Sequence, residues 1–290
     1  MQNMRLNKIV IFGVGLIGGS FSLALRKAGA VTEVVGFGRS AATLNEAKQL
    51  GILDRIGDDV AREVCDADIV LVATPVAQMA DIFKRIAPYL GANTLVTDGG
   101  STKGDVVAAA RANLGNKLSQ FIPAHPIAGG EKSGASAALA DLYQSKRVVL
   151  TPMQENGKDA VARIRKAWEI CGANVSELTA EQHDTVFAAV SHLPHLLSFA
   201  LVHDLAKRDN KDQLLSFAAS GFRDFTRIAA SSPEMWRDIC MANRDALMVE
   251  LQQYMNELEG LYLALGMNDA DKLEEVFTKA REVRSGWTQQ

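Results

Sequence analysis

Residues 8–18, K-I-V-I-F-G-V-G-L-I-G, decide the fold of this chain. Residues 9–12 are β-branched or aromatic, as in a buried strand, and a helical pattern begins within the glycine-rich segment that follows. In a G-x-G-x-x-G pattern of this kind, one glycine allows a tight turn, one lets the backbone approach a pyrophosphate and one lets the helix pack on the sheet. A glycine-rich turn without a ligand is the alternative. We predict a dinucleotide site lined by five residues of this segment: Gly13, Gly15, Leu16, Ile17 and Gly18.

Strand and helix patterns alternate through the first half of the chain. The β-rich runs cover residues 8–12, 33–37, 69–73, 94–97, 120–123, 147–151 and 174–177. Such alternation is typical of a parallel sheet with crossover helices. After residue 177 only helical patterns follow, at 179–206, 213–220, 233–239, 244–265 and 270–284. We therefore predict a Rossmann-type doubly wound α/β domain, residues 1–172, followed by an all-α domain, residues 173–290.

The composition is that of an ordinary soluble globular protein. The 290 residues are 48% apolar and 22% charged, with a net charge of -3, so that we expect no nucleic-acid partner. The three cysteines are scattered and lack metal-ligand spacing, which indicates a reducing compartment, the cytoplasm, and no metal site. The apolar run at residues 9–25 is interrupted by glycines and serines, and no other stretch is judged able to span a membrane.

The end of the second predicted strand bears on the choice of cofactor. An acidic residue there would bind the ribose hydroxyls of NAD and repel a 2′-phosphate. Gly38 stands at that position, and Arg39 and Ser40 follow, a cation and a hydroxyl suited to a phosphate. NADP is therefore favoured, while NAD stays an alternative because such an arginine also stacks on an unphosphorylated adenosine. Thr74-Pro75, after the third predicted strand, is expected to lie along the cofactor.

Four further segments carry polar residues that a structural role does not require. They are T-D-G-G-S-T-K (97–103), H-P-I-A-G-G-E-K-S-G (125–134), S-H-L-P-H (191–195) and G-F-R-D-F-T-R (221–227). Together with the glycine segment, and in this order, they make the sequence resemble the prephenate/arogenate dehydrogenases over nearly its whole length. The resemblance implies a Rossmann domain followed by a helical dimerisation domain, with the active site in the cleft between them. It also implies oxidative decarboxylation of a cyclohexadienyl substrate on the route to tyrosine, with hydride transfer to NAD(P).

The resemblance assigns roles to three residues. His125 matches the catalytic histidine, which takes the proton of the substrate hydroxyl, and Ser101 matches the serine that orients this hydroxyl or the histidine. Arg227 resembles the arginine that holds a substrate carboxylate, and Arg223 is a weaker candidate for a substrate contact. His192 and His195 lie three apart on the predicted long helix, hence on one face, and His195 is preferred over His192 for a substrate contact. Structural alternatives remain for the first three: a loop histidine, a helix N-cap and a solvated helix charge.

Two rival functions and one open question remain at this level. A β-hydroxyacid dehydrogenase would place a catalytic lysine on the long helix of its second domain, but residues 180–206 contain none. A non-catalytic NADP-sensing dimer would leave His125 and Arg227 without a joint purpose.

The long apolar stretch at 187–202 predicts a homodimer through the helical half. The sequence does not decide between prephenate and arogenate, although His195 weakly favours prephenate.

Overall fold

The computed structural model describes residues 4–130 and 132–287, so that Glu131 of the 125–134 segment lies outside the described residues. The chain forms two compact units, one reaching to Arg244 and the other beginning at Asp245. The candidate site residues all lie in the first unit.

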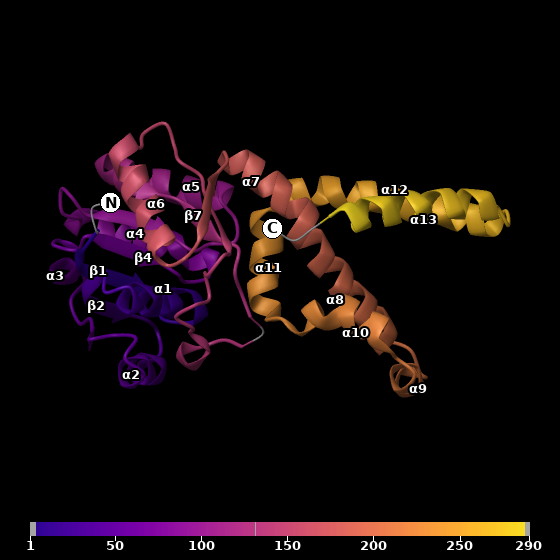
Figure 1. Cartoon of the computed structure of the whole chain (residues 1–290), viewed down its shortest axis with the longest axis horizontal. Helices are drawn as coiled ribbons and strands as arrows, with labels where there is room; N and C mark the ends of the chain where they lie inside the picture. Colours follow the sequence, from indigo (N-terminus) through magenta and orange to yellow (C-terminus); the bar gives the residue numbers. More distant parts are fainter. Residues whose placement is uncertain (1–3, 131, 288–290) are drawn as a thin grey trace. The chain divides into compact units, whose positions relative to one another are not determined.

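A parallel sheet forms the centre of the first unit (Figure 1). Its strands are β1 (Leu6–Phe12), β2 (Val31–Phe37), β3 (Arg55–Ile56), β4 (Ile69–Val72), β5 (Leu95–Asp98) and β6 (Phe121–Ile122). Their order, β3-β2-β1-β4-β5-β6, is that of a Rossmann fold, with the change of direction between β1 and β4. In such a sheet the carboxyl ends of the strands at this point form the ligand site. The predicted fold class is confirmed, and the two-residue β3 is an addition to it.

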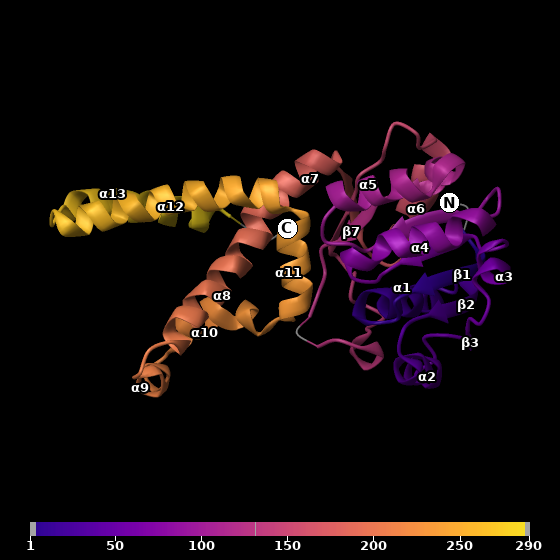
Figure 2. The ribbon, with the colours of Figure 1, turned by 180° about the vertical axis from the view of Figure 1, so that it is seen from behind.

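The sheet is buried on both faces, as the unbroken apolar strands predict. On β1, Ile9 and Ile11 belong to one buried cluster, whereas Val10 and Phe12 belong to another. This alternation follows from the two-residue period of a strand. The flanking helices, on both sides of the sheet in Figures 1 and 2, are α1 (Leu16–Lys27), α2 (Ala41–Gln49), α3 (Val60–Val64), α4 (Met79–Ile86), α5 (Gly104–Asn113) and α6 (Lys158–Ile170).

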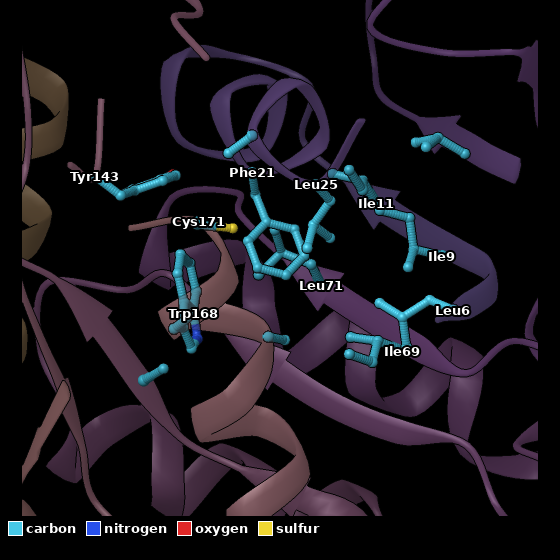
Figure 3. Packing of buried hydrophobic residues seen from close by; sticks show 14 of the residues in the cluster. Leu6, Ile9, Ile11, Phe21, Leu25, Ile69, Leu71, Tyr143, Trp168 and Cys171 are labelled. Atoms are coloured by element: carbon cyan, nitrogen blue, oxygen red, sulfur yellow. The ribbon is translucent and has the colours of Figure 1, made fainter. Parts of the chain in front are cut away.

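Large aromatic side chains join the glycine segment to the core (Figure 3). The rings of Phe21 on α1 and Trp168 on α6 lie 4.6 Å apart, and Tyr143 meets Trp168 edge to face at 5.2 Å. The hydroxyl of Tyr143 donates a 2.6 Å hydrogen bond to the carbonyl of Ile17. Burying three aromatic rings here contributes several kcal/mol to stability. The start of α1 is therefore held firmly against the sheet.

The last strands belong to a second sheet, which corrects the expectation of one parallel sheet. β8 (Arg147–Leu150) pairs antiparallel with β7 (Ala124–Pro126) and parallel with β9 (Asn174–Glu177). The ladder between β5 and β6 ends here because the amide of Ala124 donates to the side chain of Asp98, while the carbonyl of Pro123 accepts from the amide of Thr151, next to β8. The predicted end of the first domain, residue 172, lies in the turn before β9, where Gly172 has a φ of +91°.

Helices alone follow β9. In the first unit they are α7 (Ala180–Phe187), a π-helical turn (Ala188–His192), α8 (Leu193–Ala206), α9 (Lys211–Ser216), α10 (Ser220–Thr226), a 3-10 turn (Arg227–Ala230) and α11 (Pro233–Ala242). The single helix predicted at 179–206 is thus interrupted by the π-helical turn just before Pro194. A proline removes one backbone donor and crowds the preceding turn, so the wider turn accommodates it. The helix predicted at 213–220 ends earlier, and α10 begins at Ser220.

The helical run Ala180–Ala206 is long and apolar enough to cross a membrane by length and composition. This corrects the expectation that no such stretch exists, since no Asp, Glu, Lys or Arg lies between Asp184 and Asp204. Only 28% of its apolar window is buried. Length and composition of this kind also suit a core helix of a soluble protein, and the finding is therefore weak evidence for a membrane.

The second unit is a helical hairpin of α12 (Arg244–Gly266) and α13 (Ala270–Gly286). Asn268 takes a left-handed conformation in the turn, and Asp269 caps α13 by accepting a hydrogen bond from the amide of Lys272 at 2.9 Å. Large apolar side chains on this hairpin are exposed: Met248, Val249, Met255, Leu258, Tyr262, Leu263, Leu265, Met267, Phe277, Val283 and Trp287. Such a surface is typical of a contact with another chain.

Candidate active site

The glycine segment after β1 has the shape that a dinucleotide requires. Gly13 has a φ of +93°, and a Cβ there would lie 2.6 Å from the carbonyl oxygen of Ala73. A Cβ on Gly18 would lie 2.2 Å from the carbonyl oxygen of Gly13, whereas one on Gly15 would meet no atom within 4 Å. Gly13 therefore makes the turn, Gly18 allows close packing, and Gly15 leaves open space at the start of α1. The first amides of that helix offer donors to a phosphate, so the residues present fit the cofactor.

The other residues predicted to contact the cofactor follow β2 and β4. Arg39 and Ser40 are exposed at the end of β2, where the hydroxyl of Ser40 also caps α2 by accepting from the amide of Thr43 at 3.2 Å. The hydroxyl of Thr74 is buried and has no hydrogen-bond partner among the described residues. An unpaired hydroxyl at this edge of the sheet suits a polar ligand. Pro75 follows it and is exposed.

A buried ion pair joins the segment of Ser101 to the strand of His125. Lys103 and Asp98 are both fully buried and bonded to each other. The ammonium group of Lys103 also donates to the carbonyl of Ala124 at 2.9 Å, and Asp98 accepts from the amide of Ala124 at 2.9 Å. Burial of a charge requires such pairing. Ser101 lies partly buried in the turn between Asp98 and Lys103. The ion pair therefore fixes Ser101 and His125 relative to each other.

His125 lies on β7 and faces two residues of α7. Its Nδ1 is 2.8 Å from Nε2 of His183, and Nδ1 of His183 is 2.8 Å from Oδ1 of Asp184. The ring of Phe187 packs edge to face on His125 with centroids 4.9 Å apart. A carboxylate, an imidazole and a second imidazole thus form a chain that ends at the predicted catalytic histidine.

The surroundings keep His125 uncharged at neutral pH. Burial lowers the pKa of His125 well below its usual value, and electrostatic interactions with His183, Lys103 and His192 act in the same direction. Burial also lowers the pKa of His183, although the hydrogen bond to Asp184 opposes this. A neutral imidazole has one unprotonated nitrogen, and His125 therefore has the form of a proton acceptor.

Asp184 carries the negative charge of this group. Burial disfavours its charged form, but hydrogen bonds from His183 and from the amides of Gly104 and Lys103 outweigh burial and lower the pKa of Asp184. The two amide bonds measure 2.8 Å from Lys103 and 2.7 Å from Gly104. Asp184 therefore caps the start of α5 and is ionised at neutral pH.

The two histidines of the 191–195 segment differ in their surroundings. His192 is buried, with Nδ1 3.0 Å from the side-chain nitrogen of Asn243 and a hydrogen bond to the backbone of Ser101. His195 is partly buried and stacks on Trp236 with ring centroids 3.5 Å apart. His192 therefore has the contacts of a buried histidine with satisfied hydrogen bonds.

Arg227 lies close enough to His195 to affect it electrostatically. Burial lowers the pKa of His195, and the positive charge of Arg227 lowers it further. Arg227 is exposed at the start of the 3-10 turn, and Arg223 is exposed on the preceding turn of α10. The structure therefore brings Arg227 toward His195 and Trp236, and gives Arg223 no comparable contact among the residues described.

The glycine segment and the strand of His125 meet at Gly99. A Cβ on Gly99 would lie 2.9 Å from a methyl group of Ile17 and 3.9 Å from Pro126. The cofactor segment, Ser101 and His125 therefore converge at the carboxyl edge of the sheet, where ligands bind in open α/β folds.

Sequence patterns did not reveal four of the residues that hold this site together. These are Asp98, Lys103, His183 and Asp184. A histidine next to a carboxylate at 183–184 was a signal, but the spacing along one helix gave no reason to pair it with His125, 58 positions away. No group of three or more metal-ligating side chains occurs within residues 4–130 and 132–287.

Comparison with known proteins agrees with this geometry. The model of the prephenate dehydrogenase nucleotide-binding domain matches residues 21–177, and that of the prephenate dehydrogenase dimerization domain matches residues 179–279. The chain belongs to the prephenate dehydrogenase family. It is therefore an oxidoreductase of the nicotinamide-dependent kind, as the sequence resemblance implied.

Individual relatives of the family match almost the whole chain. A prephenate dehydrogenase of Bacillus subtilis is 36% identical over 98% of this chain and 77% of the relative. A cyclohexadienyl dehydrogenase of Zymomonas mobilis is 34% identical over 95% of this chain and 94% of the relative. The prephenate dehydrogenase of A. aeolicus, solved in complex with hydroxyphenyl propionate and NAD+, has a TM-score of 0.91 at 33% identity and covers 98% and 99% of the two chains.

Proposed function

We propose that this member of the prephenate dehydrogenase family oxidatively decarboxylates prephenate, arogenate or both, giving 4-hydroxyphenylpyruvate or tyrosine. The single observation that carries the proposal is a partly buried, uncharged His125 on the strand whose Pro126 meets the glycine segment at Gly99. The reaction belongs to tyrosine biosynthesis. We place it in the cytoplasm, a compartment that suits the three free thiols.

The proposed chemistry gives His125 and Ser101 one task each. His125 accepts the proton of the ring hydroxyl while the ring carboxylate leaves as carbon dioxide, and aromatisation makes the step favourable. A bound nicotinamide supplies the hydride acceptor. Ser101 orients the substrate hydroxyl, for which its partly buried place next to the ion pair of Asp98 provides a fixed position.

We propose that Arg227 binds a carboxylate of the substrate. A guanidinium group binds a carboxylate through two parallel hydrogen bonds, and the stacked pair of His195 and Trp236 lies beside it. His195 is the second substrate contact of the proposal. Arg223 stays a weaker candidate, because the pKa of His195 responds to the charge of Arg227 and not to that of Arg223.

A four-way kinetic comparison tests the proposed function. Purified protein is assayed with prephenate and with arogenate, each with NAD and with NADP, by the absorbance of the reduced cofactor. Turnover with at least one pair, at kcat/KM of about 10⁴ M⁻¹s⁻¹ or more, is the expected result. An absence of turnover with all four pairs, in protein shown to be folded and to bind the cofactor, would exclude the proposal.

We propose NADP as the preferred cofactor. The family itself indicates a nicotinamide cofactor without distinguishing NADP from NAD. Arg39→Ala is expected to raise the KM for NADP roughly ten- to hundredfold more than the KM for NAD, because a charge-assisted bond of ~1.5–3 kcal/mol exists only with the 2′-phosphate. The exposed Arg85 on α4 offers a control, since Arg85→Ala leaves the end of β2 untouched. Equal losses for both cofactors would show that Arg39 merely packs on the adenosine.

We propose that the chain works as a homodimer through its helical half. The apolar hairpin of α12 and α13 and the 28% burial of the apolar window in Ala180–Ala206 support this assembly. Light scattering at micromolar concentration should give twice the chain mass. Tyr262→Glu, on an exposed face of α12, should shift the equilibrium toward monomers, whereas Lys272→Glu on α13 should not. A fully active wild-type monomer at this concentration would contradict the proposal.

A further inference from the structure

The chain of contacts from Asp184 to His125 allows the protons on both histidine rings to be placed. Asp184 is ionised and accepts the amide hydrogens of Lys103 and Gly104, so it has only acceptors to offer to Nδ1 of His183 at 2.8 Å. That nitrogen must therefore carry a proton. Since a neutral imidazole carries one N–H, Nε2 of His183 is an acceptor.

The same reasoning applies to the next contact. Nδ1 of His125 lies 2.8 Å from Nε2 of His183, and one of the two must donate. Because Nε2 of His183 is the acceptor, Nδ1 of His125 carries the proton. Nε2 of His125 is then unprotonated, and a general base requires an unprotonated nitrogen of this kind.

We propose that His183 and Asp184 are positioning residues that fix the tautomer and ring orientation of His125 for catalysis. The inference rests on the proposed function. In the step itself the O–H bond of the substrate breaks and an N–H bond forms at Nε2 of His125, while its Nδ1 proton stays in the hydrogen bond to His183. The imidazolium is stabilised by the negative charge of Asp184 across His183, and no proton passes to the carboxylate. A carboxylate that fixes a catalytic histidine in this way acts as in a Ser-His-Asp triad, although here a second imidazole lies between them.

The groups around His125 disfavour its protonated form, so that the imidazolium needs the negative charge of Asp184. Burial, Lys103 and His192 all disfavour a proton on His125. Asp184 and Asp98 are the negative groups that act in the opposite direction on His183, and Asp98 is already paired with Lys103. Asp184 is therefore the carboxylate available to balance a charge on the two imidazoles.

The tautomer is measured directly by the ¹⁵N resonances of the histidine rings in labelled protein without substrate or cofactor. The chain has five histidines, and the signals of His125 are identified by their loss in His125→Asn. In the wild type, Nδ1 of His125 should be protonated and Nε2 unprotonated at neutral pH. The control is Glu181→Gln, which removes an exposed carboxylate from the same helix and should leave this pattern and the kinetics unchanged. Protonation of Nε2 instead of Nδ1 in the wild type would overturn the inference.

Three variants test the consequence for catalysis. Asp184→Asn offers a donor to His183 and should reverse both tautomers, which lowers kcat by ~10²–10⁴-fold. His183→Leu leaves the amide bonds of Asp184 intact and removes the acceptor, so a similar loss is expected. His183→Gln can accept from Nδ1 of His125 and should recover roughly tenfold of that loss. Equal kcat values in the leucine and glutamine variants, both folded by thermal melting, would contradict a positioning role.

The pH profile separates positioning from a merely structural effect. Loss of the Asp184 charge lowers the pKa of the His125 imidazolium, so that the acidic limb of kcat/KM should move to lower pH in Asp184→Asn. A loss of activity with an unmoved limb and an unchanged tautomer would overturn the inference while the proposed function stands. Protein with the expected tautomer that oxidises neither substrate would instead overturn the proposed function.

Discussion

His125→Asn is expected to lower kcat by ~10²–10⁴-fold and to leave the KM for the substrate nearly unchanged. Asparagine can still donate toward His183 from a similar position, but it has no nitrogen that accepts a proton near neutral pH. The loss therefore falls on the chemical step rather than on binding. Steady-state kinetics with saturating cofactor measure both constants. His203→Asn is the matched control, because His203 is exposed on α8 and away from the residues that converge at the sheet edge.

The pH dependence of wild-type activity tests the same assignment of His125 as the general base. A base whose pKa is lowered by burial is already unprotonated at neutral pH. Activity should therefore be level through neutrality and fall only as the pH drops below ~6.5, the usual histidine value, through the depressed pKa. Near-wild-type kcat with an unchanged profile in His125→Asn would show the base assignment to be wrong, and His195 would be the next residue to test.

Arg227→Ala is expected to raise the KM for the substrate roughly ten- to hundredfold with a smaller change in kcat. The reason is that a carboxylate contact worth ~1.5–3 kcal/mol exists in both the ground state and the transition state. Arg227→Lys keeps the charge but loses the planar pair of donors, and should recover only part of the affinity. The comparison is Arg223→Ala, one turn earlier on α10, for which a smaller rise in KM is expected.

The opposite pattern would contradict this assignment. If Arg227→Ala lowered kcat and left KM unchanged, the guanidinium would act on the transition state alone. A loss of the dimer would mimic either effect, so the mass of each variant is checked by light scattering before its kinetics are compared.

The Rossmann half was predictable because its signals are local. A strand, a G-x-G-x-x-G turn and a helix occur within residues 8–28, and all seven β-rich runs overlap observed strands. Which sheet a strand joins is not local. The parallel ladder ends at Ile122, where the amide of Ala124 bonds the side chain of Asp98 and β7 pairs with β8, so the outcome depends on residues far apart in the chain. For that reason the second sheet was missed.

The candidate site was predictable where one residue type suits one task. His125, Ser101 and Arg227 stand in polar segments whose order matched a family. Their supporting residues were not predictable, because Asp184 reaches Lys103 across 81 positions and His183 reaches His125 across 58. Such pairings arise only when α7 packs against the start of α5 and against β7. The apolar stretch in Ala180–Ala206 was overlooked, although no Asp, Glu, Lys or Arg lies between Asp184 and Asp204.

The most direct test of the central claim is the stoichiometry of a single reaction. The protein is incubated with NADP and with prephenate labelled in its ring carboxylate. Released carbon dioxide, reduced cofactor and 4-hydroxyphenylpyruvate are then measured. If prephenate is not turned over, arogenate labelled in the same way is used, and tyrosine is measured in place of 4-hydroxyphenylpyruvate. The account predicts equimolar amounts of all three products, and their loss together in His125→Asn. Reduction of the cofactor without release of carbon dioxide, or no reaction of either labelled substrate with folded protein, would contradict it.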